Sequence, residues 1–359
     1  MTAVEDHRTA NDDVVADGSA PSEHRVPSAY DAMFTWRYDK GSQPKLDRLY
    51  EKAKGAMWNA NELPWETEVD PESVSHANRA AMHEAGLEPD LSGTEFSSWT
   101  DAQWTELGVE NQRWMLSQFL HGEQGALLCT ARIVETVPGI DAKYYAATQV
   151  MDEARHVEVF SRYLDTKLGG AYPINKHLSA LLDDIIGDSR WDLTYLGMQI
   201  MVEGLALAAF GMMHATTTEP LLKELLHRVM ADEARHVAFG VLALQDAYAD
   251  MTSAELGERA EFAYEAAVLM RDRLQAQEIW ARMGVPFERV QELINRSPER
   301  LLFQQLLFAK IVPNCRKLGL LDARGGWLRE RFSDLGVIAF EHTPDTAEEQ
   351  LAFAVADGQ

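Results

Sequence analysis

Apolar side chains recur at every third or fourth position along most of the chain from about residue 98 onward. This spacing places them on one face of an α-helix, and the alternating runs typical of β-strands are hard to find. Turn or breaker residues such as Pro138-Gly139 and Gly169-Gly170 separate the longest of these segments. The pattern therefore predicts an all-α fold with main helices over about residues 102–136, 141–168, 190–215 and 219–248.

Both flanks of these four segments carry further structure. Three more helical segments are expected at 254–283, 286–295 and 298–317. The preceding stretch mixes helical and irregular patterns, and tryptophans stand there among Pro, Gly and Asn. The expected organisation is a disordered acidic tail (1–25), an N-terminal wrap (26–97), a four-helix bundle (98–250) and additional C-terminal helices packed on the bundle (251–359).

Composition narrows the expected partners and compartment. The formal charge of −24 at pH 7 would repel nucleic acid and anionic membranes. Two cysteines, Cys129 and Cys315, cannot build a disulfide framework, which favours a reducing compartment. The first residues lack the features of a signal peptide, and the longest wholly apolar stretch, 204–213, is too short for a membrane span. We therefore expect a cytoplasmic protein without nucleic-acid or membrane partners.

One motif occurs twice. Asp-Glu-Ala-Arg-His stands at residues 152–156 and again at 232–236. Another glutamate precedes the glutamate of each copy by thirty residues, Glu123 in the first case and Glu203 in the second. The whole unit thus recurs with a period of 80 residues. This predicts two successive helical hairpins, each with a glutamate on its first helix and a Glu-x-x-His pair on its second.

The spacing within each motif predicts a metal site. Residues i and i+3 of an α-helix share a face, and the neighbours of these polar residues on that face are apolar. Packing would therefore bury four carboxylates and two imidazoles, which is costly unless cations compensate them. Carboxylate with imidazole suits iron or manganese. The predicted ligands are Glu123, Glu153, His156, Glu203, Glu233 and His236.

The alternative is that the repeated motif binds no metal. A single Glu-x-x-His pair often lies on a solvated helix face by chance, whereas two copies with matched upstream glutamates favour a metal centre. A decayed duplication remains the other interpretation.

Two aspartates and two arginines of the motif are predicted to support the ligands. Asp152 and Asp232 are placed to accept the second N–H of the imidazole of the opposite pair, as carboxylates near metal-bound histidines do. Arg155 and Arg235 would neutralise these aspartates. A plain surface ion pair is the alternative for each arginine.

The repeated Asp-Glu-x-Arg-His string resembles the signature of bacterial multicomponent monooxygenase hydroxylase subunits, and acyl-carrier-protein desaturases carry a similar one. Over about residues 110–245 the chain resembles the ferritin-like di-iron carboxylate superfamily, which also includes ribonucleotide reductase small subunits. The resemblance implies a ferritin-like four-helix bundle with two iron ions per chain, or a Mn/Fe pair. It assigns Glu123, Glu153 and His156 to one ion and Glu203, Glu233 and His236 to the other, with one glutamate of each pair bridging.

The same resemblance implies an O2-activating oxidoreductase of the monooxygenase, oxidase or desaturase type. A diferrous pair would react with O2 through peroxo or higher-valent species and oxidise a small apolar or partly apolar organic substrate. An electron donor, either a ferredoxin or a reductase, is required, and a homodimer is expected. Candidate pocket residues, which simple core packing explains equally, are Phe160, Leu207 and Phe210.

Two departures from the family pattern shape this expectation. Phe160 stands where ribonucleotide reductase small subunits usually carry a radical tyrosine, and no threonine follows Glu203 by about one turn. Three other functions stay open. They are a ferroxidase or iron-storage bundle, an oxidase like the ribonucleotide reductase small subunit, and a non-enzymatic metal-stabilised interaction protein.

Overall fold

The computed structural model describes residues 26, 30–34, 36 and 38–349 of the 359-residue chain. The predicted tail at 1–25 lies outside the described residues, as do the last ten residues of the predicted C-terminal region. Across the described part, the regular structure is helical, without a β-strand. The predicted all-α class is confirmed.

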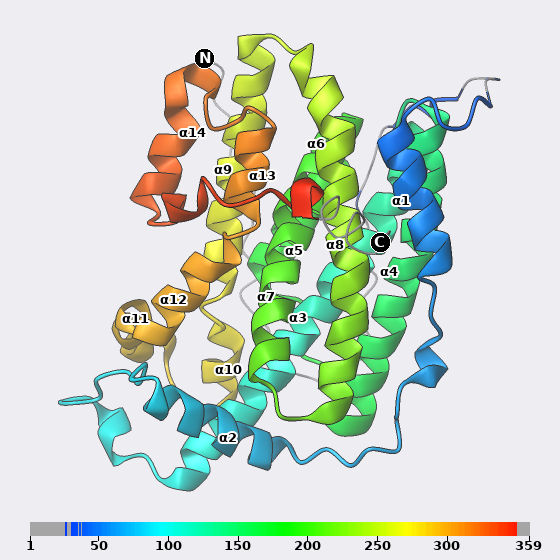
Figure 1. Ribbon diagram of the computed structural model, residues 1–359. Coiled ribbons are helices and arrows are strands. Elements are labelled where there is room, and N and C mark those ends of the chain that lie inside the picture. Colours follow the sequence, from blue (N-terminus) through cyan, green and yellow to red (C-terminus); the bar gives the residue numbers. More distant parts are fainter. Residues whose placement is uncertain (1–25, 27–29, 35, 37, 350–359) are drawn as a thin grey trace.

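Two helical hairpins form the central bundle (Figure 1). Helix α3 packs on α4, α7 packs on α8, and α4 also contacts α8. Thr100 and Gln103 form a reciprocal capping box at the start of α3, and the Glu219 side chain caps the start of α8. The bundle helices are α3 (Asp101–Thr136), α4 (Ile140–Lys167), α7 (Glu203–Thr216) and α8 (Pro220–Ala249).

The third bundle helix is not the continuous α-helix predicted over 190–215. It begins as α6 (Trp191–Tyr195), continues as the π-helix η3 (Leu196–Val202) and returns to α-helical geometry in α7. A π-turn bonds residue i to i+5 and therefore changes the direction in which the following side chains point. Glu203 is the first residue after this stretch. Apolar periodicity alone does not distinguish such a turn from regular helix.

The helix predicted over 254–283 is also interrupted. Helix α9 (Ser253–Arg273) ends early, and α10 (Gln277–Arg282) follows after a short break. Ala276 adopts a left-handed φ of 48°, a conformation that an α-helix interior does not contain. The break makes Arg273 the last residue of α9.

The segment predicted as one helix over 298–317 divides as well, around residues 308–310. Helices α5 and α14 form in segments where no separate helix was predicted. The remaining helices are α1 (Pro44–Gly55), α2 (Pro71–Glu84), α5 (Lys176–Gly187), α11 (Phe287–Arg296), α12 (Pro298–Leu307), α13 (Ile311–Lys317) and α14 (Ala323–Asp334). Short 3-10 turns are η1 (Ala60–Glu62), η2 (Glu95–Ser98) and η4 (Ile338–Phe340).

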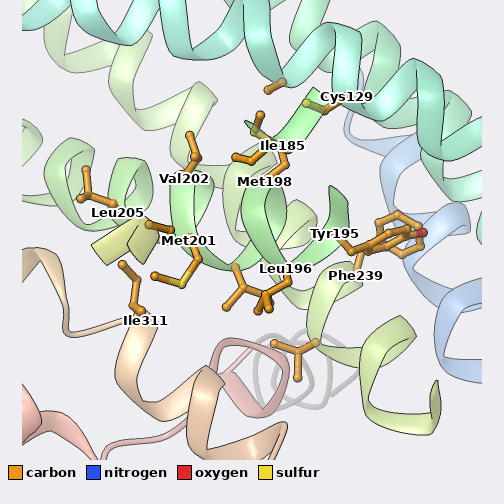
Figure 2. Packing of buried hydrophobic residues seen from close by; sticks show 14 of the residues in the cluster. Cys129, Ile185, Tyr195, Leu196, Met198, Met201, Val202, Leu205, Phe239 and Ile311 are labelled. Carbon is orange, nitrogen blue, oxygen red and sulfur yellow. The ribbon is translucent and has the colours of Figure 1, made fainter. Parts of the chain in front are cut away.

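The flanking segments cover the bundle from different sides. Helix α1 packs on α4 and α8, whereas α9 packs on α5 and η3, and α14 packs on α9 (Figure 1). Figure 2 shows the packing around the π-helix, where Met198 lies near Ile185 of α5 and Met201 lies near Ile311 of α13. One apolar core therefore joins the bundle to its flanks. The division into wrap, bundle and C-terminal helices stays a prediction.

Within the described part of the chain, one helical stretch, Trp191–Thr216, has the length and mean hydropathy (1.5) of a membrane span. It is the third bundle helix, and 72% of its apolar window is buried inside the protein. Its composition matches its place in the core.

Candidate metal centre

The six predicted metal ligands meet in the interior of the bundle. Each helix of the bundle contributes to the site, and every one of the six side chains is at most 5% exposed. Their ligand atoms form two overlapping groups, and within each group all atoms lie within 4.8 Å of one another. The groups are Glu123, Glu153, His156 and Glu233, and Glu153, Glu203 and His236.

Both imidazoles turn Nδ1 toward the carboxylates. His156 Nδ1 lies 3.2 Å from Glu123 Oε2 and 3.1 Å from Glu233 Oε1. His236 Nδ1 lies 3.1 Å from Glu153 Oε1 and 3.5 Å from Glu233 Oε1. Glu153 belongs to both groups and Glu233 approaches both imidazoles, so these two glutamates lie between the two halves of the site. The assignment of each ligand to one ion stays a prediction.

Several of these buried atoms need a partner. Glu153 Oε2, Glu203 Oε2 and both carboxylate oxygens of Glu233 lack a hydrogen-bond partner among the described residues. Burial, reinforced by neighbouring carboxylates, raises the pKa of Glu123 and of Glu203 well above its ordinary value. Burial alone would also raise the pKa of Glu153, but the two imidazoles hold it below its usual range. Divalent cations would satisfy these oxygens, and the residues present therefore fit a pair of metal ions.

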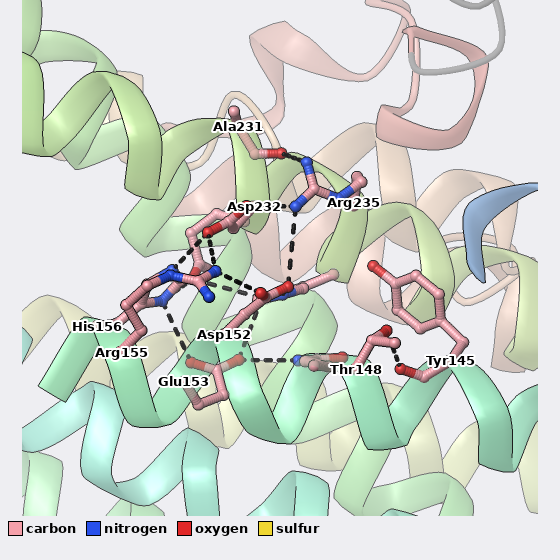
Figure 3. A network of polar contacts seen from close by, with 12 residues as sticks. Tyr145, Thr148, Asp152, Glu153, Arg155, His156, Ala231, Asp232 and Arg235 are labelled. Atoms are coloured by element: carbon pink, nitrogen blue, oxygen red, sulfur yellow. Dashed lines mark hydrogen bonds and ion pairs between the residues drawn. The ribbon is translucent and has the colours of Figure 1, made fainter. Parts of the chain in front are cut away.

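Each aspartate of the repeated motif contacts the histidine of the opposite copy. Asp232 Oδ2 lies 3.2 Å from His156 Nε2, and Asp152 Oδ2 lies 3.2 Å from His236 Nε2. These contacts hold the far nitrogen of each ring, so that the ring plane is fixed and Nδ1 faces the carboxylates. Figure 3 shows this arrangement around His156.

The two arginines of the motif are buried beside these aspartates. Arg155 Nη2 lies 2.9 Å from Asp232 Oδ2 and also contacts Asp152. Arg235 donates to Asp232 and lies 3.8 Å from Asp152 Oδ2 (Figure 3). At 7% and 3% exposure, neither arginine forms a surface ion pair. The two cations compensate the two buried aspartates.

Two side chains that sequence analysis did not single out join this network. Gln149 Nε2 donates to Glu153 Oε1 at 3.0 Å and to Glu203 Oε1 at 2.9 Å. Trp58 Nε1 donates to Asp232 Oδ2 at 2.8 Å. Gln149 lies one helical turn before Glu153, and this spacing could have predicted that it contacts the ligand. Nothing in the sequence pattern connects Trp58 with Asp232.

A small cavity lies beside the metal-site carboxylates. Its wall includes Glu123, Glu203 and Glu233, together with residues of α3, the end of η3 and α7, and Arg273 of α9. Its volume is about 20 Å³, which is enough for a water molecule. An organic substrate could enter only if lining side chains moved.

The predicted pocket residues lie in the adjoining core. Phe160 and Phe210 stack with ring centroids 5.6 Å apart, and Leu207 is 7% exposed. Phe119, whose ring lies 4.6 Å from that of Phe210, lines the cavity, whereas the three predicted residues do not. A pocket role for Phe160, Leu207 and Phe210 stays a prediction.

A ferritin-like bundle with buried carboxylates and imidazoles in this arrangement defines a di-metal carboxylate protein, a class that includes O2-activating oxygenases and oxidases. The particular family follows from the sequence model described as "P-aminobenzoate N-oxygenase AurF", which matches residues 94–319. The chain belongs to this family. The matched span contains all six predicted ligands, and the predicted class of di-iron oxidoreductase is confirmed.

Solved structures with a similar fold include R2-like ligand-binding oxidases. A mutant with an anaerobically reconstituted Mn/Fe cofactor is 17% identical, with a TM-score of 0.48, over 78% of this chain and 94% of that chain. An R2-like ligand-binding oxidase with an aerobically reconstituted metal cofactor, after photoconversion, is 17% identical, with a TM-score of 0.44, over 86% of this chain and 95% of that chain. No curated protein matches the chain.

Proposed function

We propose that this protein oxidises a small, partly apolar organic substrate with O2 at a pair of iron ions held by the six buried residues, a Mn/Fe pair being the alternative. The observation that carries the proposal is the set of unpartnered carboxylate oxygens facing two buried imidazoles. Polar atoms in a purely structural core are normally hydrogen-bonded, whereas these oxygens would be satisfied by two cations.

As the resemblance implies, Glu123, Glu153 and His156 would hold one ion and Glu203, Glu233 and His236 the other; Glu153 belongs to both groups of ligand atoms, and Glu233 approaches both imidazoles. The bound metals supply the redox chemistry with O2. Asp152 and Asp232 hold the Nε2 atoms of the two histidines, so that Nδ1 stays directed at the centre. Gln149 fixes the carboxylates of Glu153 and Glu203, and its amide cannot titrate.

The family description guides the choice of substrate. Since it names N-oxygenation of p-aminobenzoate, we take an aromatic amine as the first candidate substrate and oxygenation of its nitrogen as the first candidate reaction. Electrons would come from a ferredoxin or a reductase. We further propose a cytoplasmic homodimer without membrane or nucleic-acid partners.

The ligand assignment is tested by metal counting. Wild-type protein loaded with Fe(II) under anaerobic conditions should retain about two irons per chain. Glu203→Ala should retain about one or fewer, because the carboxylate lost has no substitute in the site. Glu110→Gln is the matched control. Glu110, on α3, is buried like Glu203, but it accepts a hydrogen bond from Tyr172 and does not belong to the metal site. Full iron content in Glu203→Ala would remove Glu203 from the ligand set.

The activity is tested with the same loaded protein. With p-aminobenzoate, O2 and a chemical reductant, mass spectrometry should detect a product carrying 18O from labelled O2, and Glu203→Ala should give none. Incubation with excess Fe(II) and O2 separates catalysis from storage. Retention of hundreds of irons per assembly, or a product without label from O2, would contradict the oxygenase proposal.

A further inference from the structure

Arg273 is a buried arginine for which the described part of the chain provides no charged partner. It is the last residue of α9 and is 5% exposed. Among the described residues, nothing forms an ion pair or a side-chain hydrogen bond with its guanidinium, and burial alone lowers its pKa to about 10. Arg273 therefore remains a cation at neutral pH.

Other buried arginines of the chain are compensated. Arg155 and Arg235 share two aspartates, and Arg259 forms an ion pair with Asp192 at 2.9 Å. Burying an unpaired charge is strongly destabilising, so such a group points to a ligand that pairs with it in the working protein.

The surroundings of Arg273 indicate where that ligand binds. Arg273 lines the same small cavity as Glu123, Glu203 and Glu233 of the metal site. Gln118, another polar residue of this wall, is already satisfied, because it accepts the Asn175 N–H at 2.8 Å and donates to the Pro173 carbonyl at 3.0 Å. Arg273 is thus the cationic side chain that lines the cavity, and its N–H groups are free to bind a ligand.

We propose that Arg273 binds a carboxylate of the substrate and thereby directs the other end of the molecule toward the metal centre. A guanidinium matches a carboxylate with two parallel hydrogen bonds, which fixes orientation as well as charge. This inference rests on the proposed function of the same site. Because the cavity is small, substrate binding requires Phe119 or its neighbours to move so that an aromatic ring can enter.

The test compares two probes that differ in one charge. Anaerobic calorimetry on the metal-loaded protein measures the binding of p-aminobenzoate and of p-aminobenzamide. Wild type should prefer the carboxylate, and Arg273→Met should weaken p-aminobenzoate binding by about 10–100-fold while leaving p-aminobenzamide nearly unchanged. Arg271→Met is the matched control, because Arg271 lies on the same helix turn but pairs with Asp272.

A purely structural role makes a different prediction. Removing an arginine that holds the fold together would lower the melting temperature, whereas replacing an unpaired buried charge with methionine should keep or raise it. Equal affinities of wild type and Arg273→Met for p-aminobenzoate, or no binding of this probe to wild type, would overturn the inference. Labelled-O2 incorporation is measured separately, so charge-selective binding without turnover would contradict the oxygenase proposal and leave the role of Arg273 standing.

Discussion

Asp232 receives contacts from three separate parts of the chain. His156 and Arg155 reach it from α4, Arg235 from its own helix and Trp58 from the N-terminal segment. Burial alone would raise its pKa, but the hydrogen bond and charge of His156, together with the charges of Arg235 and His236, hold the pKa below its usual range. The carboxylate is therefore charged at neutral pH, and its charge is what fixes the His156 ring.

Asp232→Asn should weaken metal binding while keeping the shape of the side chain. We expect an affinity loss of about 10–100-fold, the usual effect of changing the partner of a ligating histidine. Competition with a chelator of known affinity measures it. Trp58→Phe removes one donor and keeps the charge, so its loss should be smaller. If both variants bound metal like wild type, Asp232 would have no part in holding His156.

At the scale of elements, the contact between α8 and the π-helix positions Glu203. A Cβ added at Gly240 of α8 would lie 2.5 Å from the Cβ of Gln199 in η3. That atom belongs to the root of a side chain and cannot move without its backbone. The close approach therefore needs glycine, and Gln199 lies one turn before Glu203.

Gly240→Ala should destabilise the protein and disturb the site. We expect a loss of about 1–3 kcal/mol in the free energy of unfolding from the steric overlap, together with weaker metal binding. Gly211→Ala is the matched control, because its nearest neighbour, Met230 Cε, is 3.8 Å away. It should be neutral or more stable by up to about 1 kcal/mol. Urea unfolding measures the free energy of unfolding of both variants. Equal values for Gly240→Ala and Gly211→Ala would show that α8 and η3 can move apart without cost.

At the scale of the whole molecule, the centre of the core contains a cluster of buried carboxyl groups. Glu123 and Glu203 have raised pKa values in the metal-free fold, so the folded protein holds protons there more tightly than the unfolded chain. This stabilisation is present below the ordinary value of 4.5 and is lost as the pH rises through the raised values. A bound metal pair takes over the role of these protons.

Removing the metals should therefore lower the melting temperature, and more so at pH 8 than at pH 6. With free metal about a hundredfold above its Kd, the expected difference is roughly 5–10 °C. Calorimetric scans with and without chelator at both pH values measure it. The raised pKa values of His156 and His236 act in the same direction. A difference that shrinks with pH would mean that the metals do not replace these protons.

The sequence by itself determined the helical class, the duplicated hairpin and the six residues that meet in the core. It could do so because the direction of a helical side chain depends on local geometry, and the spacing between Glu153 and His156 already places both on one face. The same reasoning located Asp152 and Asp232 beside the ligands.

Only the tertiary structure decided the π-helix before Glu203, the end of α9 at Arg273 and the contact between Trp58 and Asp232. Each depends on packing between segments far apart in the chain, and Trp58 and Asp232 are separated by 174 positions. Periodicity records which face of a helix is buried. It does not record which neighbour fills the space, because that depends on how the helices pack against one another.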